Sequence, residues 1–399
     1  MSQFSGYKPN PYYNSIPSSY VTQHERYVTR GDWVYTIEEV KKLDKSEYYR
    51  VSPGSDGWLW LRKQITQVET VIDISTKIPK EVRVKAKFKV NASELPNLLG
   101  FYTPQIQKKW GSSSWKNYDN SEFEALILGK SGEIPMTKQK SMNFERGHAE
   151  EWKGKLYTLL KFKDLIMKET GPFPYTGNAE IEYSTTPDFL WEETVKGTEG
   201  VGEIKSLVPF FHDKKTDLFN YGKRKRPTTI KKENIPQTQL EMKGTGKMYN
   251  LTVYITTNDG ALFVVTTSNT LYVNRMTKAI QWARDTYFKN KKPVPKEKHP
   301  FEDYEGYDEL IEMTELMAET TINTDFCKCL GVEVHSPMFL DKLEKETKVE
   351  SPPKEDTPPE ESKPIVVKLP PPKIPPKKRK RVESKIPEKK TKYEIIVID

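Results

Sequence analysis

Hydrophobic and polar residues alternate along several parts of the chain with the period of a β-strand. The clearest case is the segment 81–90, in which basic and apolar residues alternate strictly. This pattern predicts a half-buried strand with one basic face, because successive side chains of a strand point to opposite sides. The basic face consists of Arg83, Lys85, Lys87 and Lys89. Plain solvation of that face is the alternative to a role in binding.

Two more strands are predicted at 251–258 and 261–269, where β-branched and aromatic residues dominate. Asp259-Gly260 stands between them, and this dipeptide is typical of tight hairpin turns.

Apolar residues recur with helical spacing elsewhere. In 143–162, Trp152, Leu156, Leu159 and Leu160 predict the core face of a helix. Residues 91–101 predict a capped helical turn, with Ser93 as N-cap and an apolar stripe. That stripe is formed by Leu95, Leu98 and Leu99. Further helices are predicted at 122–128, 235–248, 274–290 and about 302–320.

These patterns divide the chain into three regions. Residues 1–84 begin as an irregular arm, but their tryptophans favour packing on the core. Residues 85–342 carry the strands and helices of the main domain. Residues 343–399 are dominated by Pro, Lys and Glu, so we expect a disordered tail that cannot form a core.

The charge of the chain favours a polyanionic partner. Its 399 residues carry a formal net charge of +8, and the basic residues cluster. In 210–234, lysines and arginines are interleaved with aromatic residues, which predicts a loop that contacts phosphates. An ordinary solvated loop is the alternative. The densest basic run of this segment is Lys223, Arg224, Lys225 and Arg226.

The chain has only two cysteines, Cys327 and Cys329, which excludes a disulfide scaffold and fits a reducing compartment. Together with His335 they do not complete a zinc site. The first residues lack the features of a secretory signal. No apolar run approaches the ~20 residues of a membrane helix, so no membrane partner is expected.

Two short motifs lie in the tail. The run 375–382 resembles a nuclear import signal and predicts a nuclear protein with an import receptor as partner; a non-specific DNA-binding tail is the alternative. Its basic residues are Lys377, Lys378, Arg379, Lys380 and Arg381. The C-terminal segment 393–399 resembles a SUMO-interacting strand, and a frayed or packed strand is the alternative.

The candidate chemistry lies between 186 and 205. Glu203 and Lys205 are two apart, so on a strand they share a face, while Ile204 points into the core. Asp188 brings a second carboxylate from the neighbouring strand or turn, and the glycine-rich spacer 195–202 suits a hairpin. Two carboxylates and the Ile204 carbonyl suit Mg²⁺, for which Mn²⁺ can substitute. A surface hairpin with a solvated ion pair is the alternative.

This pattern resembles the PD-(D/E)xK nucleases. Four pieces in order, at 91–100, 146–151, 186–205 and 237–242, are similar to the phage lambda exonuclease-like (YqaJ-type viral recombinase) branch, which includes viral alkaline exonucleases. The resemblance covers roughly residues 85–290. It implies that Asp188, Glu203, the Ile204 carbonyl and Glu151 bind metal, that Lys205 is catalytic, that Gln239 holds the metal site or the water, and that Ser93 contacts DNA.

The chain also departs from the family. Asn91 stands where the family usually has Thr, and the arginine that anchors the DNA phosphate has no clean counterpart. Arg83, Lys85 and Lys87 lie near the expected place, and Arg62 is a rival.

The sequence therefore predicts an α/β fold with a PD-(D/E)xK restriction-endonuclease-like core, a mixed central sheet flanked by helices. The predicted activity is Mg²⁺-dependent 5′→3′ exonuclease on double-stranded DNA, serving viral or mobile-element recombination or replication in the nucleus of a eukaryotic host cell. A single-strand annealing protein, SUMO and further copies of the chain are candidate partners. The alternatives are a structure-selective endonuclease and a non-catalytic DNA-binding protein, although Asp188, Glu203 and Lys205 argue against the latter.

Overall fold

A computed structural model describes much of the chain between Glu25 and Asn323. The described ranges are 25–62, 67–72, 79–84, 88–112, 120–129, 137–176, 180–207, 210–213, 215–221, 227–256 and 260–323. All of them lie within one compact unit of the chain, Met1–Lys342. The predicted tail with its import and SUMO motifs, and Cys327, Cys329 and His335, lie outside the described residues.

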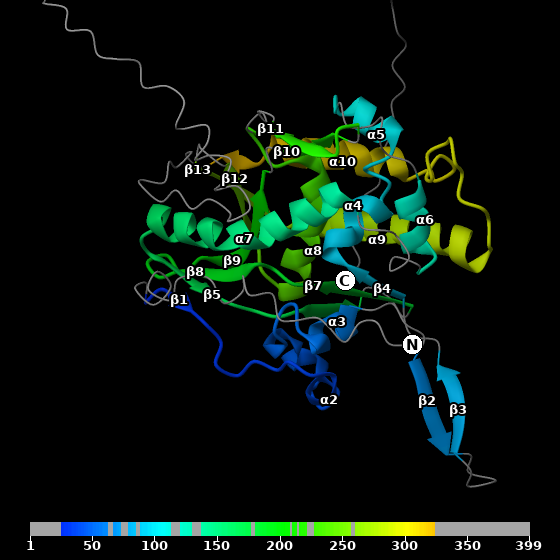
Figure 1. Cartoon of the computed structure of the whole chain (residues 1–399), viewed down its shortest axis with the longest axis horizontal. Coiled ribbons are helices and arrows are strands. Elements are labelled where there is room, and N and C mark those ends of the chain that lie inside the picture. Colours follow the sequence, from blue (N-terminus) through cyan, green and yellow to red (C-terminus); the bar gives the residue numbers. More distant parts are fainter. Residues whose placement is uncertain are drawn as a thin grey trace, which may run out of the picture. The chain divides into compact units, whose positions relative to one another are not determined.

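The centre of this unit is a mixed seven-stranded sheet (Figure 1). Its strands, in spatial order, are β1 (Tyr27–Val28), β5 (Leu165–Lys168), β8 (Phe189–Glu193), β9 (Glu199–Ser206), β12 (Tyr249–Thr256), β13 (Gly260–Thr267) and β14 (Ile322–Asn323). The pairs β1–β5 and β9–β12 are parallel, and the other neighbours are antiparallel. The predicted hairpin around Asp259-Gly260 is confirmed in its two paired strands.

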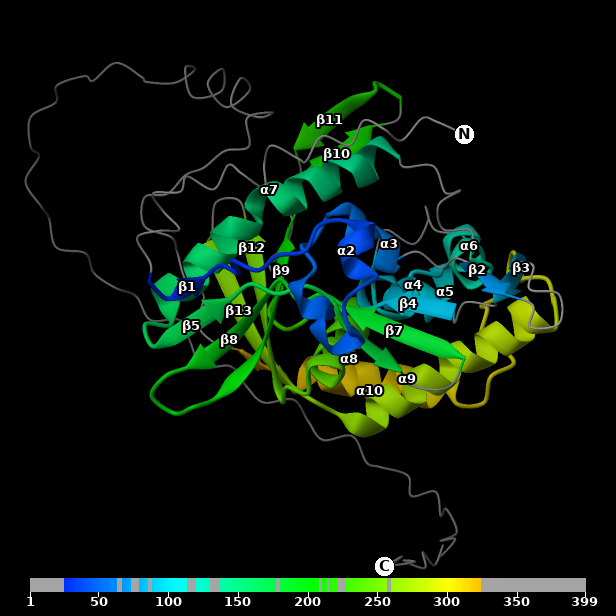
Figure 2. The same ribbon diagram turned by 90° about the horizontal axis from the view of Figure 1, so that it is seen from below.

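Helices cover both faces of the sheet. Helix α7 (Lys138–Lys161) packs on one face, where Val253 and Ile204 join its apolar residues in one cluster. On the other face, α8 (Ile235–Thr245), α9 (Thr270–Ala283) and α10 (Tyr307–Glu319) bury residues such as Tyr254. Figure 2 shows α9 and α10 lying against each other. The two covered faces agree with the predicted mixed α/β class.

The helices follow the predicted periodicity with local differences. Leu156 and Leu159 of α7 are buried, but Leu160 is 47% exposed, so its assignment to the core face was wrong. Helix α9 begins before the predicted start and continues as a π-helix over Arg284–Lys289. Three further short helices are α5 (Pro104–Lys109), α6 (Ser121–Ile127) and the 3₁₀ turn Lys232–Asn234.

A second, three-stranded sheet combines two strands that lie between β5 and β8 in the chain with one much earlier strand. Its order is β4 (Phe88–Asn91), β7 (Ile181–Thr185) and β6 (Phe173–Thr176), and β4 runs parallel to β7. Strand β4 leads into a 3₁₀ turn (Ala92–Glu94) and α4 (Leu95–Leu98). The N-cap is Asn91 and not the predicted Ser93, which lies within the 3₁₀ turn. The Glu94 carboxylate accepts hydrogen bonds from the main chain and the side chain of Asn91.

Two small hairpins were not predicted. The strands β2 (Gln67–Ile72) and β3 (Pro79–Val84) pair with each other, so the alternating segment 81–90 belongs to two strands, β3 and β4. The strands β10 (Phe210–Asp213) and β11 (Leu218–Tyr221) pair within the segment predicted as a loop. The side chain of Arg83, and the residues Lys85, Lys87 and Lys223 to Arg226, lie outside what the structure describes.

The N-terminal region has a small apolar cluster of its own. Helix α2 (Ile37–Val40), the 3₁₀ helix Lys45–Arg50 and α3 (Asp56–Arg62) enclose a small cluster to which Trp58 and Trp60 contribute. Arg26, just before β1, donates hydrogen bonds to the main-chain carbonyls of Leu159, Phe162, Lys163 and Leu165, where α7 ends and β5 begins. None of the helices in the described ranges combines the length and apolar character needed to span a membrane.

Candidate active site

Asp188 lies where the chain passes from one sheet to the other. Only Thr186, Pro187 and Asp188 separate β7 of the small sheet from β8 of the central sheet. The Asp188 N–H donates to the Gly202 carbonyl at 3.0 Å, and its Oδ2 accepts from the Ile204 N–H at 2.6 Å. The aspartate side chain therefore continues the β8–β9 ladder beyond its last main-chain pair, Phe189 with Gly202.

Ile204 has its main chain at the site and its side chain in the core. The N–H and C=O of one residue in an extended strand point to the same edge. Because the Ile204 N–H faces Asp188, its carbonyl also faces the open edge beside Asp188. The Ile204 side chain packs toward Gly154 of α7, where an added Cβ would lie only 2.7 Å from Ile204 Cγ2. Close contact of α7 with β9 thus depends on the missing side chain of Gly154.

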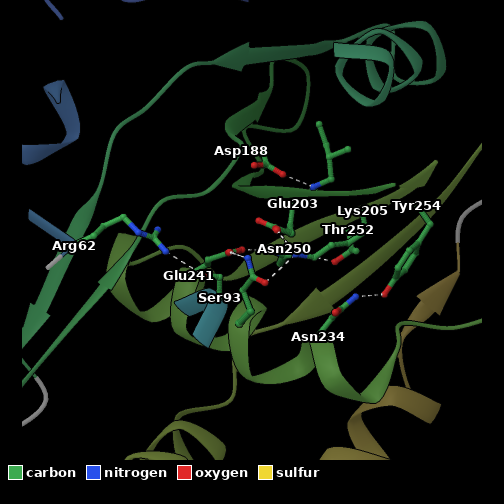
Figure 3. Close-up of polar contacts among 12 residues, drawn as sticks. Arg62, Ser93, Asp188, Glu203, Lys205, Asn234, Glu241, Asn250, Thr252 and Tyr254 are labelled. Atoms are coloured by element: carbon green, nitrogen blue, oxygen red, sulfur yellow. Dashed lines mark hydrogen bonds and ion pairs between the residues drawn. The ribbon is translucent and has the colours of Figure 1, made fainter. Parts of the chain in front are cut away.

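Glu203 and Lys205 point to the opposite face, toward α8 (Figure 3). Glu203 is 5% exposed, and its Oε1 accepts from Lys205 Nζ at 2.5 Å. Lys205 Nζ also donates to Gln237 Oε1 of α8 at 2.9 Å. The lysine is therefore held by two acceptors and acts as a donor in both contacts.

The charges of the site act on one another. Burial raises the pKa of Asp188 well above its usual value, and the negative charges of Glu203 and Glu151 add to this effect. Burial opposes the ammonium form of Lys205, but Glu203 and Asp188 outweigh it and raise the pKa of Lys205. The site thus combines closely spaced carboxyl groups with the Lys205 ammonium. Strongly shifted pKa values of this kind are common at active sites.

Glu151 lies on α7, near enough to raise the pKa of Asp188. Its Oε1 accepts from Lys155 Nζ at 2.7 Å, and its Oε2 lies 3.9 Å from His148 Nδ1. Burial opposes its ionisation, but Lys155 and His148 prevail and lower the pKa of Glu151 to about 2. Glu151 is therefore a fixed negative charge beside the site.

The structure does not bring Gln239 to the site. Its Nε2 donates to the Thr267 carbonyl at 2.8 Å and its Oε1 accepts from the Asn269 N–H at 2.7 Å, which ties α8 to the start of α9. Gln237 contacts Lys205 instead. Residues two apart on a helix point to nearly opposite sides, so only one of the two glutamines can face β9.

The sequence analysis missed Glu241, Asn250 and Thr252, which lie behind Glu203 and Lys205 (Figure 3). Glu241 is fully buried on α8, four residues after Gln237. Thr252 of β12 stands opposite Glu203 in the parallel register. The spacing of Gln237 and Glu241, which puts both on one helix face, is the signal that could have found them.

The oxygen donors suit a hard divalent cation. Glu203 Oε2 is buried and has no hydrogen-bond donor among the described residues, so one carboxylate oxygen is left for another partner. Within the same residues, no three His, Cys, Asp or Glu side chains converge closely enough to hold a metal by themselves. Asp188, Glu203 and the Ile204 carbonyl would therefore need water or substrate oxygens as further ligands, which Mg²⁺ usually keeps.

An arginine is fixed near this centre. Arg62 Nη2 donates to Ser93 Oγ at 3.1 Å, and the guanidinium stacks on Trp58 at 4.4 Å from the ring centre. The Trp58 indole N–H donates to Thr186 Oγ1 at 3.3 Å, two residues before Asp188. Arg62, the rival anchor in the sequence, and Ser93 are thus brought together beside the Asp188 turn.

Comparison with known proteins gives limited information. The chain is similar to two crystal structures of an alkaline exonuclease (LHK-Exo) from Laribacter hongkongensis, one of them in complex with dAMP. In both cases the TM-score is 0.32 and the identity 18%, over 51% of this chain and 92% of the other. No family model matches the chain, and no curated protein matches it. At this TM-score the function has to be argued from the side chains of the site.

Proposed function

We propose that the protein is a Mg²⁺-dependent deoxyribonuclease, a 5′→3′ exonuclease on double-stranded DNA with a PD-(D/E)xK core. The observation that carries the proposal is the arrangement on β8 and β9. Asp188 accepts the Ile204 N–H, and Glu203 and Lys205 share the adjacent face. Two carboxylates, a carbonyl and an ammonium at one strand edge match the requirements of metal-assisted phosphodiester hydrolysis.

Each residue would have a defined part in the reaction. Asp188, Glu203 and the Ile204 carbonyl would hold the ion, which supplies an activated water and neutralises charge on the phosphate when bound. Lys205 donates two of its three N–H groups to Glu203 and Gln237. Its third N–H is left to orient the attacking water or to stabilise the charge that develops on phosphate oxygens.

Arg62 and Ser93 are the best candidates for holding the terminal phosphate of the DNA. A guanidinium binds phosphate through two parallel N–H donors, and stacking on Trp58 limits its freedom before binding. Removing Arg62 should therefore weaken selection of 5′-phosphorylated ends more than it slows the chemical step.

The proposal is tested by digesting linear duplex DNA, labelled at either end, with purified protein and Mg²⁺, Mn²⁺ or EDTA. We expect metal-dependent release of mononucleotides from 5′ ends, and no cutting of covalently closed circles. Asp188→Ala, Glu203→Gln and Lys205→Ala should each lower the rate at least about 10³-fold, the loss of roughly 4 kcal/mol of transition-state stabilisation.

Glu192→Gln is the matched control, because Glu192 lies on the same hairpin in an exposed pair with Lys168. It should keep the parental rate. Full activity of Asp188→Ala would reject the site, cutting of closed circles would favour an endonuclease, and metal-independent DNA binding without cleavage would favour a DNA-binding protein.

A further inference from the structure

A chain of hydrogen bonds leads from Lys205 to a carboxyl group that the proposed reaction does not use. Lys205 Nζ donates to Gln237 Oε1, and Gln237 Nε2 donates to Glu241 Oε1 at 2.8 Å. From the other side, Thr252 Oγ1 donates to Asn250 Oδ1 at 2.8 Å, and Asn250 Nδ2 donates to Glu241 Oε2 at 3.1 Å. Both chains of donors end on Glu241.

This arrangement fixes the direction of the Gln237 amide. With the amide reversed, its NH₂ group would face the Lys205 ammonium, which is repulsive, and Glu241 Oε1 would lose its N–H donor. Lys205 therefore requires the amide oxygen, and Glu241 holds the opposite NH₂ end of the amide in place. Without Glu241, Gln237 Nε2 would lose its acceptor, and only the contact with Lys205 would hold the amide.

Glu241 is itself held from the side of the sheet. Glu241, Asn250 and Thr252 are each 0% exposed, so water does not compete for their hydrogen bonds. Burying a carboxyl group is unfavourable unless its oxygens are bonded, and here each oxygen has one donor from a different element, α8 and β12. The hydrogen bonds of Gln237 and Glu241 on α8 are thus anchored to β12, the strand that pairs with β9.

We propose that Glu241 is a positioning residue for the hydrolytic reaction: it orients Gln237, and through Gln237 it directs the free N–H of Lys205 toward the reacting phosphate. This inference rests on the proposed nuclease function and extends it to a residue that touches neither DNA nor metal.

The kinetic test compares Glu241→Leu, Gln237→Leu and the double variant in single-turnover cleavage at saturating DNA. Each single variant should lower the rate about 10- to 100-fold, because a misdirected catalytic group loses that much. The double variant should be no slower than the slower single variant, since both act through one amide. Rates that multiply would overturn the proposal.

Glu241→Gln separates orientation from charge. Its amide oxygen can still accept from Gln237, and its NH₂ group can donate to Asn250 after Asn250 turns over. We expect this variant to stay within about 3-fold of the parent, with unchanged DNA affinity and Mg²⁺ half-saturation. A rate as low as that of Glu241→Leu, or a shifted Mg²⁺ half-saturation, would overturn the proposal.

An experiment without catalysis keeps the inference independent of the nuclease assignment. The side-chain amide signals of Gln237 are assigned in the NMR spectrum by their loss in Gln237→Leu. In the parent they should exchange slowly with water, and in Glu241→Leu they should exchange fast. Thr238→Val is the control on the same helix, because its hydroxyl donates to the Ile235 carbonyl, away from Gln237 and Glu241.

An unchanged Gln237 amide in Glu241→Leu would overturn the positioning role even if the parent cuts DNA. A parent that does not cut DNA would overturn the proposed function and leave the amide result to decide the network. If Glu241→Leu does not fold, Glu241→Met takes its place with the same expected outcomes, since methionine adapts better to a core.

Discussion

At the scale of residues, the protonation states of the buried polar groups follow from their hydrogen-bond partners. Lys205 keeps its proton because Glu203 and Gln237 both accept from it, which suits a cationic donor and not a general base. His299 is the opposite case. Its Nδ1 accepts the Phe301 N–H, and its Nε2 lies 3.3 Å from the Gly100 carbonyl, so the ring is bound as the neutral tautomer with the proton on Nε2.

His299 should therefore make folding dependent on pH. Burial lowers its pKa to about 4, although the negative charges of Glu302 and Asp308 oppose this. Between about pH 6.5 and 4 the unfolded chain binds a proton that the folded chain does not, so stability falls as the pH falls. The loss attributable to His299 should be on the order of 2–3 kcal/mol, measured as the free energy of unfolding in urea at a series of pH values.

The variant His299→Gln should lose this part of the pH dependence. It keeps a polar side chain beside Gly100 but cannot take up a proton in this range. An equal slope of stability against pH in His299→Gln and the parent would show that the ring is not responsible.

At the scale of elements, the distance between α7 and β9 decides where the site residues lie. Gly154 is the point of closest approach, because three carbons of the Ile204 side chain occupy the space of a Cβ. Ile204 stands between Glu203 and Lys205, so any shift that relieves a clash there moves both of them. The absence of a side chain at Gly154 therefore allows α7 to pack closely on β9 and keeps Glu203 and Lys205 in place.

Gly154→Ala should consequently destabilise the fold by about 1–3 kcal/mol through overpacking and should lower the cleavage rate as well. Gly147→Ala is the matched control on the same helix, because no atom of the described residues lies within 4 Å of its added methyl. It should be stabilising by about 0.5–1 kcal/mol, as expected for Gly→Ala inside a helix. Thermal unfolding and single-turnover rates check both, and a neutral Gly154→Ala would contradict the packing argument.

Local sequence patterns predicted the helices and strands better than they predicted which strands pair with each other. The alternation at 251–258 and the spacing around Leu156 reveal faces, because each depends on neighbours within one turn or strand. The pairing of β4 with β7 joins Phe88 to Ile181, and no local pattern announces it. The segment 210–221 has the charge of a loop, but Phe210–Asp213 pairs with Leu218–Tyr221, because strand pairing depends on context more than on composition.

For the candidate site, too, local spacing predicted the residues at one strand edge but not their long-range partners. Asp188, Glu203 and Lys205 were chosen from their spacing, and the structure brings them to one strand edge. The resemblance implied Gln239, but Gln237 contacts Lys205, because the rotation of α8 about its axis, which tertiary packing sets, decides which glutamine faces β9. The signal for Glu241 was its spacing from Gln237 on one helix face, but this spacing does not show that the carboxyl group is buried among donors.

At the scale of the whole molecule, the positive charge has to be matched to a path for DNA. The run from Lys223 to Arg226 connects β11 to the helix that carries Gln237. The following segment is fixed to β12, since the Tyr254 hydroxyl accepts hydrogen bonds from Lys231 and Asn234. We propose that this basic run contacts DNA phosphates close to the point of cleavage.

Neutralising the basic run from Lys223 to Arg226 should weaken binding and flatten its dependence on salt. Each lost phosphate contact should reduce the log–log slope of affinity against salt by roughly 0.9 on duplex DNA. The measurement uses Asp188→Ala protein, so that the substrate survives, over a salt series. Parallel slopes for variant and parent would show that the run is merely solvated, and the path would then be sought along β3 or the tail.

The three-residue passage from β7 to β8 has a consequence for the order in which the protein matures. Asp188 reaches its place only after β8 has paired with its near neighbour β9 and β7 has found the much earlier β4. Pairings between distant segments form slowly. The proposed cleavage of DNA should therefore begin late in folding, and slight local opening of the small sheet should abolish it well before the molecule unfolds.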